Sequence, residues 1–240
     1  MDKPVRVAFV GAGNMAREHL KALLQDSAVE IVAFADVDKS KCAARIAEVQ
    51  AIRPKAVVAA YDDAPRMLRS ERPDAAYVVV PPFGHGPAEL ACIEMGIPFF
   101  IEKPVGLDIG VTRVILQGVN EKGLLTCAGY MNRYREGVQN ARQTLQQDPA
   151  VLLHGGWIGG SPGAGSWWIQ KNLSGGQMIE QTTHTFDLVR YLGGEAAEVF
   201  AYAATGFNTG IPDYSIEDAT AVNVHLQNGG VAVLLSCCAA

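Results

Sequence analysis

A glycine-rich turn at residues 11–16 restricts the fold of this chain more than any other feature. An apolar run, Val5–Val10, leads directly into the sequence G-A-G-N-M-A, and an amphipathic stretch follows. In such a strand–turn–helix, the first glycine permits the tight turn, the second lets phosphates approach the backbone, and the small last residue keeps helix and strand close. The helix N-terminus favours an anion. The residues expected to hold the pyrophosphate of a dinucleotide are Gly11, Gly13, Asn14, Met15 and Ala16.

Short apolar runs alternate with amphipathic stretches as far as Cys127. This alternation is typical of βαβ units built on a parallel sheet. The expected strands are 5–10, 30–35, 57–61, 75–80, 98–101 and 124–127, and the expected helices are 14–25, 39–49, 64–69, 87–95 and 108–122. We therefore predict an α/β, doubly wound Rossmann domain over residues 1–127.

The pattern changes after Cys127 to that of an α+β domain. A helix is expected over 134–147, a strand over 151–158, a Gly/Ser/Trp-rich loop over 159–176, a helix over 179–192, and strands over 198–205, 219–226 and 231–238. Strands joined only by turns favour antiparallel pairing, so residues 128–240 are predicted to contain a mostly antiparallel sheet. The final apolar run would form a bare sheet edge. We therefore expect an exposed or intermolecularly paired edge there, and a chain that is incomplete.

Composition excludes several classes of protein. The 240 residues carry a net charge of −5 with acids and bases interspersed, which argues against nucleic acid as a partner. The N-terminal apolar run is too short for a signal peptide or a membrane span, so a cytoplasmic protein without membrane association is expected. The five cysteines form no metal-binding or disulfide pattern, and no metal is expected.

Asp36 stands at the end of the second expected strand, twenty positions after Ala16. A carboxylate at this place can accept hydrogen bonds from a ribose diol. It would repel a 2′-phosphate, and no arginine follows it immediately, so NAD is expected rather than NADP. The other interpretation is a helix N-cap or turn aspartate, a role for which Asp38 competes.

Two further polar motifs follow expected strands, at the sheet edge where ligands bind in open α/β folds. Pro81 and His85 lie after the fourth strand, where His85 could line a cofactor pocket or be a solvated loop residue. Glu102 and Lys103 follow the fifth strand. Lys103 could donate to a substrate oxygen, or it could be an exposed lysine paired with Glu102.

Together these motifs resemble those of the Gfo/Idh/MocA oxidoreductase family. The resemblance rests on the glycine-rich turn, on Pro81-Pro82 with His85, on Glu102-Lys103-Pro104, on the segment 129–134, and above all on the Gly-Gly segment and helix at 174–187. It implies that NAD is the cofactor. The residues then also expected to contribute to NAD binding are Pro81, His85, Glu102 and Lys103. It further implies a C-terminal sheet that forms homo-oligomers.

The same resemblance implies a catalytic pair, in which Lys103 assists His184 in moving a hydroxyl proton. Glu180 stands four residues before His184, where the family commonly has aspartate. On a single helix these two side chains would share one face, and imidazole titrates near neutral pH, as a base of this kind requires. His184 alone could equally be a core histidine, and Asp187 is expected to be structural.

The substrate is expected to be a sugar, polyol or related small polar molecule bound by Lys103, Glu180 and His184. Arg133 and Trp168 are also assigned to it, although Arg133 could instead pin the joint between the domains and Trp168 could pack on the sheet. The expected activity is NAD-dependent hydride transfer at a CH–OH carbon. An NAD-binding regulator without turnover and a redox-assisted glycosidase are the alternatives.

Overall fold

The computed structural model describes residues 3–239, which form two compact units that divide after Gly129. Cys127 lies inside the last strand of the first unit, so this unit extends two residues beyond the expected boundary. Within the described part of the chain, no helix is long and apolar enough to cross a membrane.

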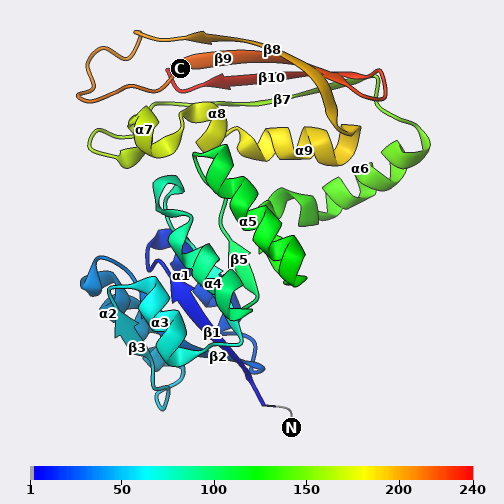
Figure 1. Ribbon diagram of the computed structural model, residues 1–240. Coiled ribbons are helices and arrows are strands. Elements are labelled where there is room, and N and C mark those ends of the chain that lie inside the picture. Colours follow the sequence, from blue (N-terminus) through cyan, green and yellow to red (C-terminus); the bar gives the residue numbers. More distant parts are fainter. Residues whose placement is uncertain (1–2, 240) are drawn as a thin grey trace. The chain divides into compact units, whose positions relative to one another are not determined.

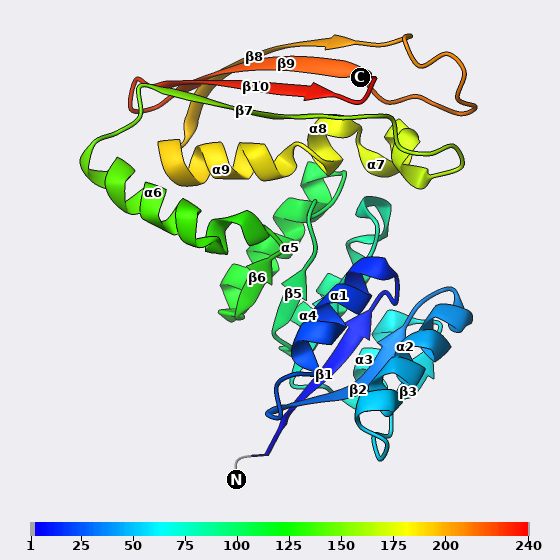
Figure 2. The same cartoon turned by 180° about the vertical axis from the view of Figure 1, so that it is seen from behind.

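The first unit is a doubly wound Rossmann domain, as predicted (Figures 1 and 2). Six parallel strands lie in the order β3-β2-β1-β4-β5-β6. The strands are β1 (Val5–Val10), β2 (Val29–Ala35), β3 (Ala59–Tyr61), β4 (Ala75–Val78), β5 (Phe99–Ile101) and β6 (Thr126–Ala128). The helices are α1 (Asn14–Leu23), α2 (Lys39–Ile52), α3 (Ala64–Glu71), η1 (Pro82–Gly84), α4 (Pro87–Met95) and α5 (Ile109–Lys122).

The strand order places a topological switch point between β1 and β4. From β1 the chain builds outward to β2 and β3, and then returns to the other side of β1 to add β4, β5 and β6. Val10 pairs with Val78, so the segments that follow β1 and β4 leave the same edge of the sheet side by side. Ligands of open α/β sheets bind at such a point.

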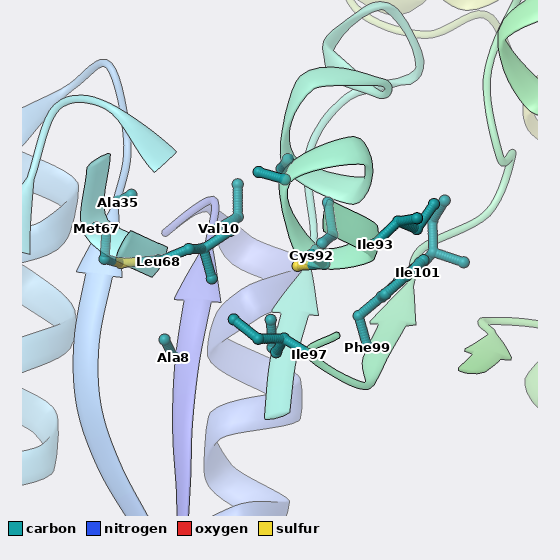
Figure 3. Packing of buried hydrophobic residues seen from close by; sticks show 14 of the residues in the cluster. Ala8, Val10, Ala35, Met67, Leu68, Cys92, Ile93, Ile97, Phe99 and Ile101 are labelled. Carbon is teal, nitrogen blue, oxygen red and sulfur yellow. The ribbon is translucent and has the colours of Figure 1, made fainter. Parts of the chain in front are cut away.

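Buried side chains on both faces of this sheet hold the helices. On one face, residues of α3, α4 and α5 pack against Ala8, Val10, Phe99 and Ile101 in the cluster of Figure 3. On the other, α1 and α2 cover a row of stacked rings, Phe34, Phe9, Tyr77 and Phe100, whose neighbouring centroids are 5.0–5.2 Å apart. Alternation of side chains along each strand separates the two clusters.

The second unit is an α+β domain with a mixed, mostly antiparallel sheet in the order β7-β10-β9-β8. Its strands are β7 (Leu152–Ile158), β8 (Ala196–Ala204), β9 (Ala219–Leu226) and β10 (Val231–Cys237). Its helical segments are η2 (Met131–Tyr134), α6 (Glu136–Gln147), η3 (Trp167–Ile169), α7 (Lys171–Ser174), α8 (Gln177–Glu180) and α9 (Thr183–Gly193).

The expectation that the final run forms a bare sheet edge is wrong. β10 lies inside the sheet, antiparallel to β9 and parallel to β7, and its inward side chains, such as Leu234, are fully buried. The edges are β7 and β8. Sequence order suggested a terminal edge, but β7 supplies the second neighbour, since Val231 pairs with Leu152, 79 residues earlier in the chain.

Two predictions for residues 159–192 also need correction. The expected loop contains the helical segments η3 and α7. The single helix expected over 179–192 is two helices, because the amide of Thr182 donates to Gln177 O and that of Thr185 to Thr182 O, which interrupts the ladder of bonds four residues apart.

One face of the second sheet is covered and the other is not. α8 and α9 lie along one face, where Val189, Val222 and Leu234 share a buried cluster (Figure 1). No described element covers the opposite face (Figures 1 and 2). The register places on this outer sheet face the apolar side chains Ile158, Phe200, Tyr202, Ala221, Leu235 and Cys237.

Replacing Ile101 by alanine should destabilise the first unit by about 2–5 kcal/mol, because the side chain is 5% exposed in the core and its removal leaves a cavity. Urea unfolding followed by circular dichroism measures the loss. Leu125→Ala is the control, because Leu125 is 79% exposed and should change stability by less than about 0.5 kcal/mol. Equal effects of the two substitutions would contradict this description of the core.

Candidate functional site

The turn after β1 requires glycine at residue 11. Gly11 has φ +90°, and a Cβ atom there would lie 2.0 Å from the carbonyl oxygen of Val79. The amide of Val79 in turn donates to Val10 O. The turn therefore passes directly over the end of β4, and any side chain would push the two apart.

Gly13 has a different role from Gly11. Its φ is −73°, which any residue can adopt, and no atom lies within 4 Å of a Cβ built on it. It precedes α1, where Ala16 is fully buried and Asn14 and Met15 are exposed. Gly13 thus leaves open space beside the free N–H groups of a helix N-terminus, which fits a pyrophosphate.

Asp36 supports the glycine-rich turn from the end of β2. Its Oδ2 accepts the amide of Ala12 at 2.8 Å, and its Oδ1 accepts the amide of Asp38 at 2.9 Å. The helix N-cap is Asp38, whose side chain accepts the amide of Ser40. The capping role thus belongs to Asp38, whereas the bond from the Asp38 amide makes Asp36 a turn aspartate, and its contact with a ribose stays a prediction.

Pro81 and His85 follow β4, on either side of the short helix η1. The His85 side chain is fully buried, and its Nδ1 donates to Glu89 Oε1 at 2.6 Å. Glu89 Oε2 accepts the amide of Gly86 at the start of α4. The solvated-loop interpretation of His85 is therefore wrong, because the Glu89 carboxylate holds the ring inside the fold.

Glu102 and Lys103 follow β5. The Glu102 carboxylate is nearly buried; its Oε2 accepts the backbone amide of Lys103 at 2.7 Å, and its Oε1 lies 3.0 Å from His19 Nε2. The Lys103–Pro104 peptide is cis. These contacts pair Glu102 with His19, a residue to which no sequence motif assigned a role.

A sequence signal for His19 was available. Ala16, Leu20 and Leu23 occupy the apolar positions of α1 that face the sheet, and His19 falls within the same stripe. A polar residue in an apolar stripe needs a buried partner. What periodicity could not supply was the partner, because Glu102 is 83 residues away in the chain.

In the second unit, an ion pair between Arg133 of η2 and Asp187 of α9 connects these two elements. Arg133 Nε and Nη2 donate to both carboxylate oxygens of buried Asp187, at 2.5–3.0 Å, and the guanidinium lies 4.9 Å from the ring centroid of Tyr191. The hydrogen bonds that Arg133 donates to the Asp187 carboxylate raise the pKa of Arg133. This geometry agrees with a structural role for Asp187, while the substrate contact of Arg133 stays a prediction.

Glu180 and His184 lie on either side of the interruption between α8 and α9. Glu180 is nearly buried at the end of α8, and the His184 ring meets Tyr130 edge-on, with centroids 6.2 Å apart. Trp168, in η3, is half-buried, and its amide donates to Ser166 Oγ. Glu180 and His184 therefore do not share the face of one continuous helix.

The Gly-Gly segment before α8 has a steric cause. Gly176 has φ +90°, and a Cβ there would lie 2.2 Å from Glu217 Oε2, whose carboxylate pairs with Lys171.

Lys103 belongs to the first unit, and Glu180 and His184 belong to the second. Over residues 3–239, no group of three or more His, Cys, Asp or Glu side chains could hold a metal ion.

Two family models match the chain. Residues 5–130 match the model described as "Oxidoreductase family, NAD-binding Rossmann fold", and residues 151–240 match the "GFO/IDH/MocA C-terminal domain". The N-terminal unit is thus an NAD-binding Rossmann domain.

Several relatives are similar to the chain. A putative UDP-kanosamine synthase oxidoreductase subunit from Amycolatopsis mediterranei is 33% identical over 198 residues, which cover 80% of this chain and 53% of that protein. The scyllo-inositol 2-dehydrogenase (NAD(+)) of Bacillus subtilis is 23% identical, over 95% of this chain and 66% of that protein. The crystal structure of myo-inositol 2-dehydrogenase from Lactobacillus plantarum superposes with a TM-score of 0.86 at 21% identity, over 99% of this chain and 71% of that one. The chain therefore spans about half to two thirds of the length of these curated relatives.

Gly11→Ala and Gly13→Ala should separate folding from cofactor binding. Gly11→Ala should lower the melting temperature, because the new Cβ meets Val79 O and the backbone is left-handed. Gly13→Ala should leave the melting temperature nearly unchanged and weaken NADH binding, measured by nicotinamide fluorescence, because its Cβ enters the space assigned to the pyrophosphate. Undiminished NADH affinity in Gly13→Ala would contradict the assignment.

Proposed function

This chain belongs to the Gfo/Idh/MocA oxidoreductase family, and from that membership we propose that it transfers a hydride between NAD and a CH–OH carbon of a sugar, polyol or related small polar substrate. One observation carries the proposal. The open space at Gly13, at the start of α1, which we call the pyrophosphate cradle, and the segment Glu102-Lys103-Pro104 both lie at the carboxyl edge of the same parallel sheet. A cytoplasmic location stays our expectation from the sequence.

The residues proposed to hold the cofactor surround the switch point. The N–H groups that follow Gly13 bind the pyrophosphate, and Asp36 binds the adenosine ribose while its Oδ2 also accepts the amide of Ala12. A 2′-phosphate would meet this carboxylate with like charge, which favours NAD over NADP. We also propose that the cofactor site is lined by three residues at the carboxyl ends of β4 and β5, namely Pro81, His85 and Glu102.

Proton transfer is assigned to the two motifs that the family resemblance singles out. His184 takes the hydroxyl proton, Lys103 donates a hydrogen bond to the reacting oxygen and opposes charge on it, and Glu180 orients the base. When bound, NAD supplies the hydride acceptor. Arg133 and Trp168 are proposed to line the substrate site.

Relatives support the substrate class. The names of similar proteins describe inositol dehydrogenases and an oxidoreductase subunit of UDP-kanosamine synthase. The compounds in these names, inositol and UDP-kanosamine, are a hydroxyl-rich ring compound and a nucleotide derivative of one. A screen of polyols, sugars and sugar acids with NAD and with NADP, followed at the NADH absorbance, tests the proposal. Binding of NADH without turnover of any substrate would favour the regulator, and glycoside cleavage without accumulated NADH would favour the glycosidase.

Loss of either member of the catalytic pair should lower turnover strongly. His184→Ala and Lys103→Ala should each reduce kcat by roughly 10²–10⁴, since a positioned acid–base group contributes about that factor. NADH affinity should change little, because neither side chain is assigned to the pyrophosphate or the adenosine ribose. Lys55→Ala, at an exposed position of the first unit, is the control. Near-normal turnover by His184→Ala would assign the base to another residue.

We further propose that the chain forms a homo-oligomer through the outer sheet face of the second unit. Phe200 is 57% exposed and Tyr202 is 71% exposed there, beside an apolar hollow of about 380 Å³ that reaches Ile158 and Leu235. Monomeric proteins seldom leave so continuous an apolar patch in water. A second copy of this chain presents the same apolar patch, as a two-fold contact requires.

Sedimentation velocity over a range of protein concentrations should therefore detect a dimer or larger species. Phe200→Glu should shift the population to monomer, because it places a charge on the proposed interface beside Tyr202. Val57→Glu, at an 88% exposed position in the first unit, should leave the distribution unchanged. A wild-type monomer at all concentrations would contradict the proposed interface.

A further inference from the structure

We infer that His19 and Glu102 form a positioning pair, which sets the backbone of Lys103 and links it to the helix that begins at the cofactor turn. The inference rests on the proposed function for the role of Lys103. Its geometry lies wholly within the first unit and involves neither the pyrophosphate cradle nor the second unit.

Glu102 is placed by the register of the sheet. Its amide donates to Val78 O, which continues the ladder between β4 and β5 by one residue. Side chains alternate along a strand, so Glu102 projects to the same face as Phe100, toward α1. There its Oε2 accepts the amide of Lys103 at 2.7 Å. This bond restrains the backbone at the residue from which the lysine side chain departs.

A nearly buried carboxylate needs a second donor, and His19 provides it. His19 Nε2 lies 3.0 Å from Glu102 Oε1, and a hydrogen bond between them leaves each carboxylate oxygen with a donor. The imidazole is held by two aromatic rings, with its centroid 4.7 Å from that of Phe100 and 5.6 Å from that of Tyr77. The ring orientation that points Nε2 at Glu102 is therefore set by packing.

Gly129 completes the arrangement. It follows β6, and its amide donates to Ile101 O, beside Glu102. A Cβ on Gly129 would lie 2.9 Å from Glu102 Oε2 and 3.1 Å from the Phe100 ring. A side chain at residue 129 would therefore push Glu102 away from the amide that it accepts. Three segments far apart in the chain thus converge on one carboxylate.

The consequence is a physical link between the cofactor helix and the lysine. α1 begins at the pyrophosphate cradle and carries His19 one and a half turns later. Because His19 holds Glu102 and Glu102 holds the amide of Lys103, the lysine backbone is fixed relative to α1. Small misplacements of a reacting group lower turnover strongly.

The test uses two substitutions that differ in where the amide nitrogen falls. His19→Gln places its Nε2 near the position of the imidazole Nε2 and should keep the bond to Glu102, whereas His19→Asn places its nitrogen near Nδ1 and should lose it. His19→Asn and His19→Ala should lower kcat by roughly tenfold or more, with NADH affinity nearly unchanged, and His19→Gln should restore most of the loss. Glu18→Ala, which removes only an exposed ion pair of the neighbouring residue, is the control.

Amide hydrogen exchange at Lys103 provides a readout that needs no substrate. Exchange should accelerate in His19→Asn and His19→Ala and stay slow in His19→Gln and Glu18→Ala. Wild-type exchange and kcat in His19→Asn would overturn the inference, as would a His19→Gln variant as impaired as His19→Ala. If the wild-type chain oxidises no substrate, the proposed function fails, and the exchange comparison alone then decides whether His19 positions the Lys103 backbone.

Discussion

The first unit depends on the close contact between the turn after β1 and the end of β4. Val79 O lies where a Cβ of residue 11 would be, so only glycine lets the chain turn there and start α1 at the edge of the sheet. With its start at that edge, α1 lies over the aromatic row of the sheet and brings His19 to Glu102. The steric constraint at Gly11 thus affects both the anion site at the start of α1 and the contact of His19 with Glu102, whose carboxylate accepts the amide of Lys103.

Buried carboxylates within each of the two units are paired with neighbouring side chains. Glu102 bonds His19, Glu89 bonds His85, and Asp187 bonds Arg133. Removing one member of such a pair leaves a desolvated charge, which is strongly destabilising. Two of these carboxylates also accept backbone amides, Glu89 from Gly86 and Glu102 from Lys103, so the pairs restrain the segments that follow β4 and β5.

The second unit is arranged around an asymmetric sheet. α8 and α9 bury the inward side chains of β9 and β10, whereas the outer sheet face is apolar and has no described element over it. Because α8 ends at Glu180 and α9 begins at Thr183, Glu180 and His184 belong to different helices. Gly175 and Gly176 both have positive φ, +79° and +90°, a backbone conformation that favours glycine at each position.

The sequence by itself determined the features that depend on local order. Hydrophobic periodicity and turn residues predicted the Rossmann unit and its glycine-rich turn. Tertiary structure alone decided the features that depend on distant partners. β10 became an internal strand because β7 pairs with it, Asp36 acquired a bond to Ala12, and His19 met Glu102 across 83 residues. Periodicity shows which side chains turn inward, but the identity of their partners depends on how separate strands and helices pack in space.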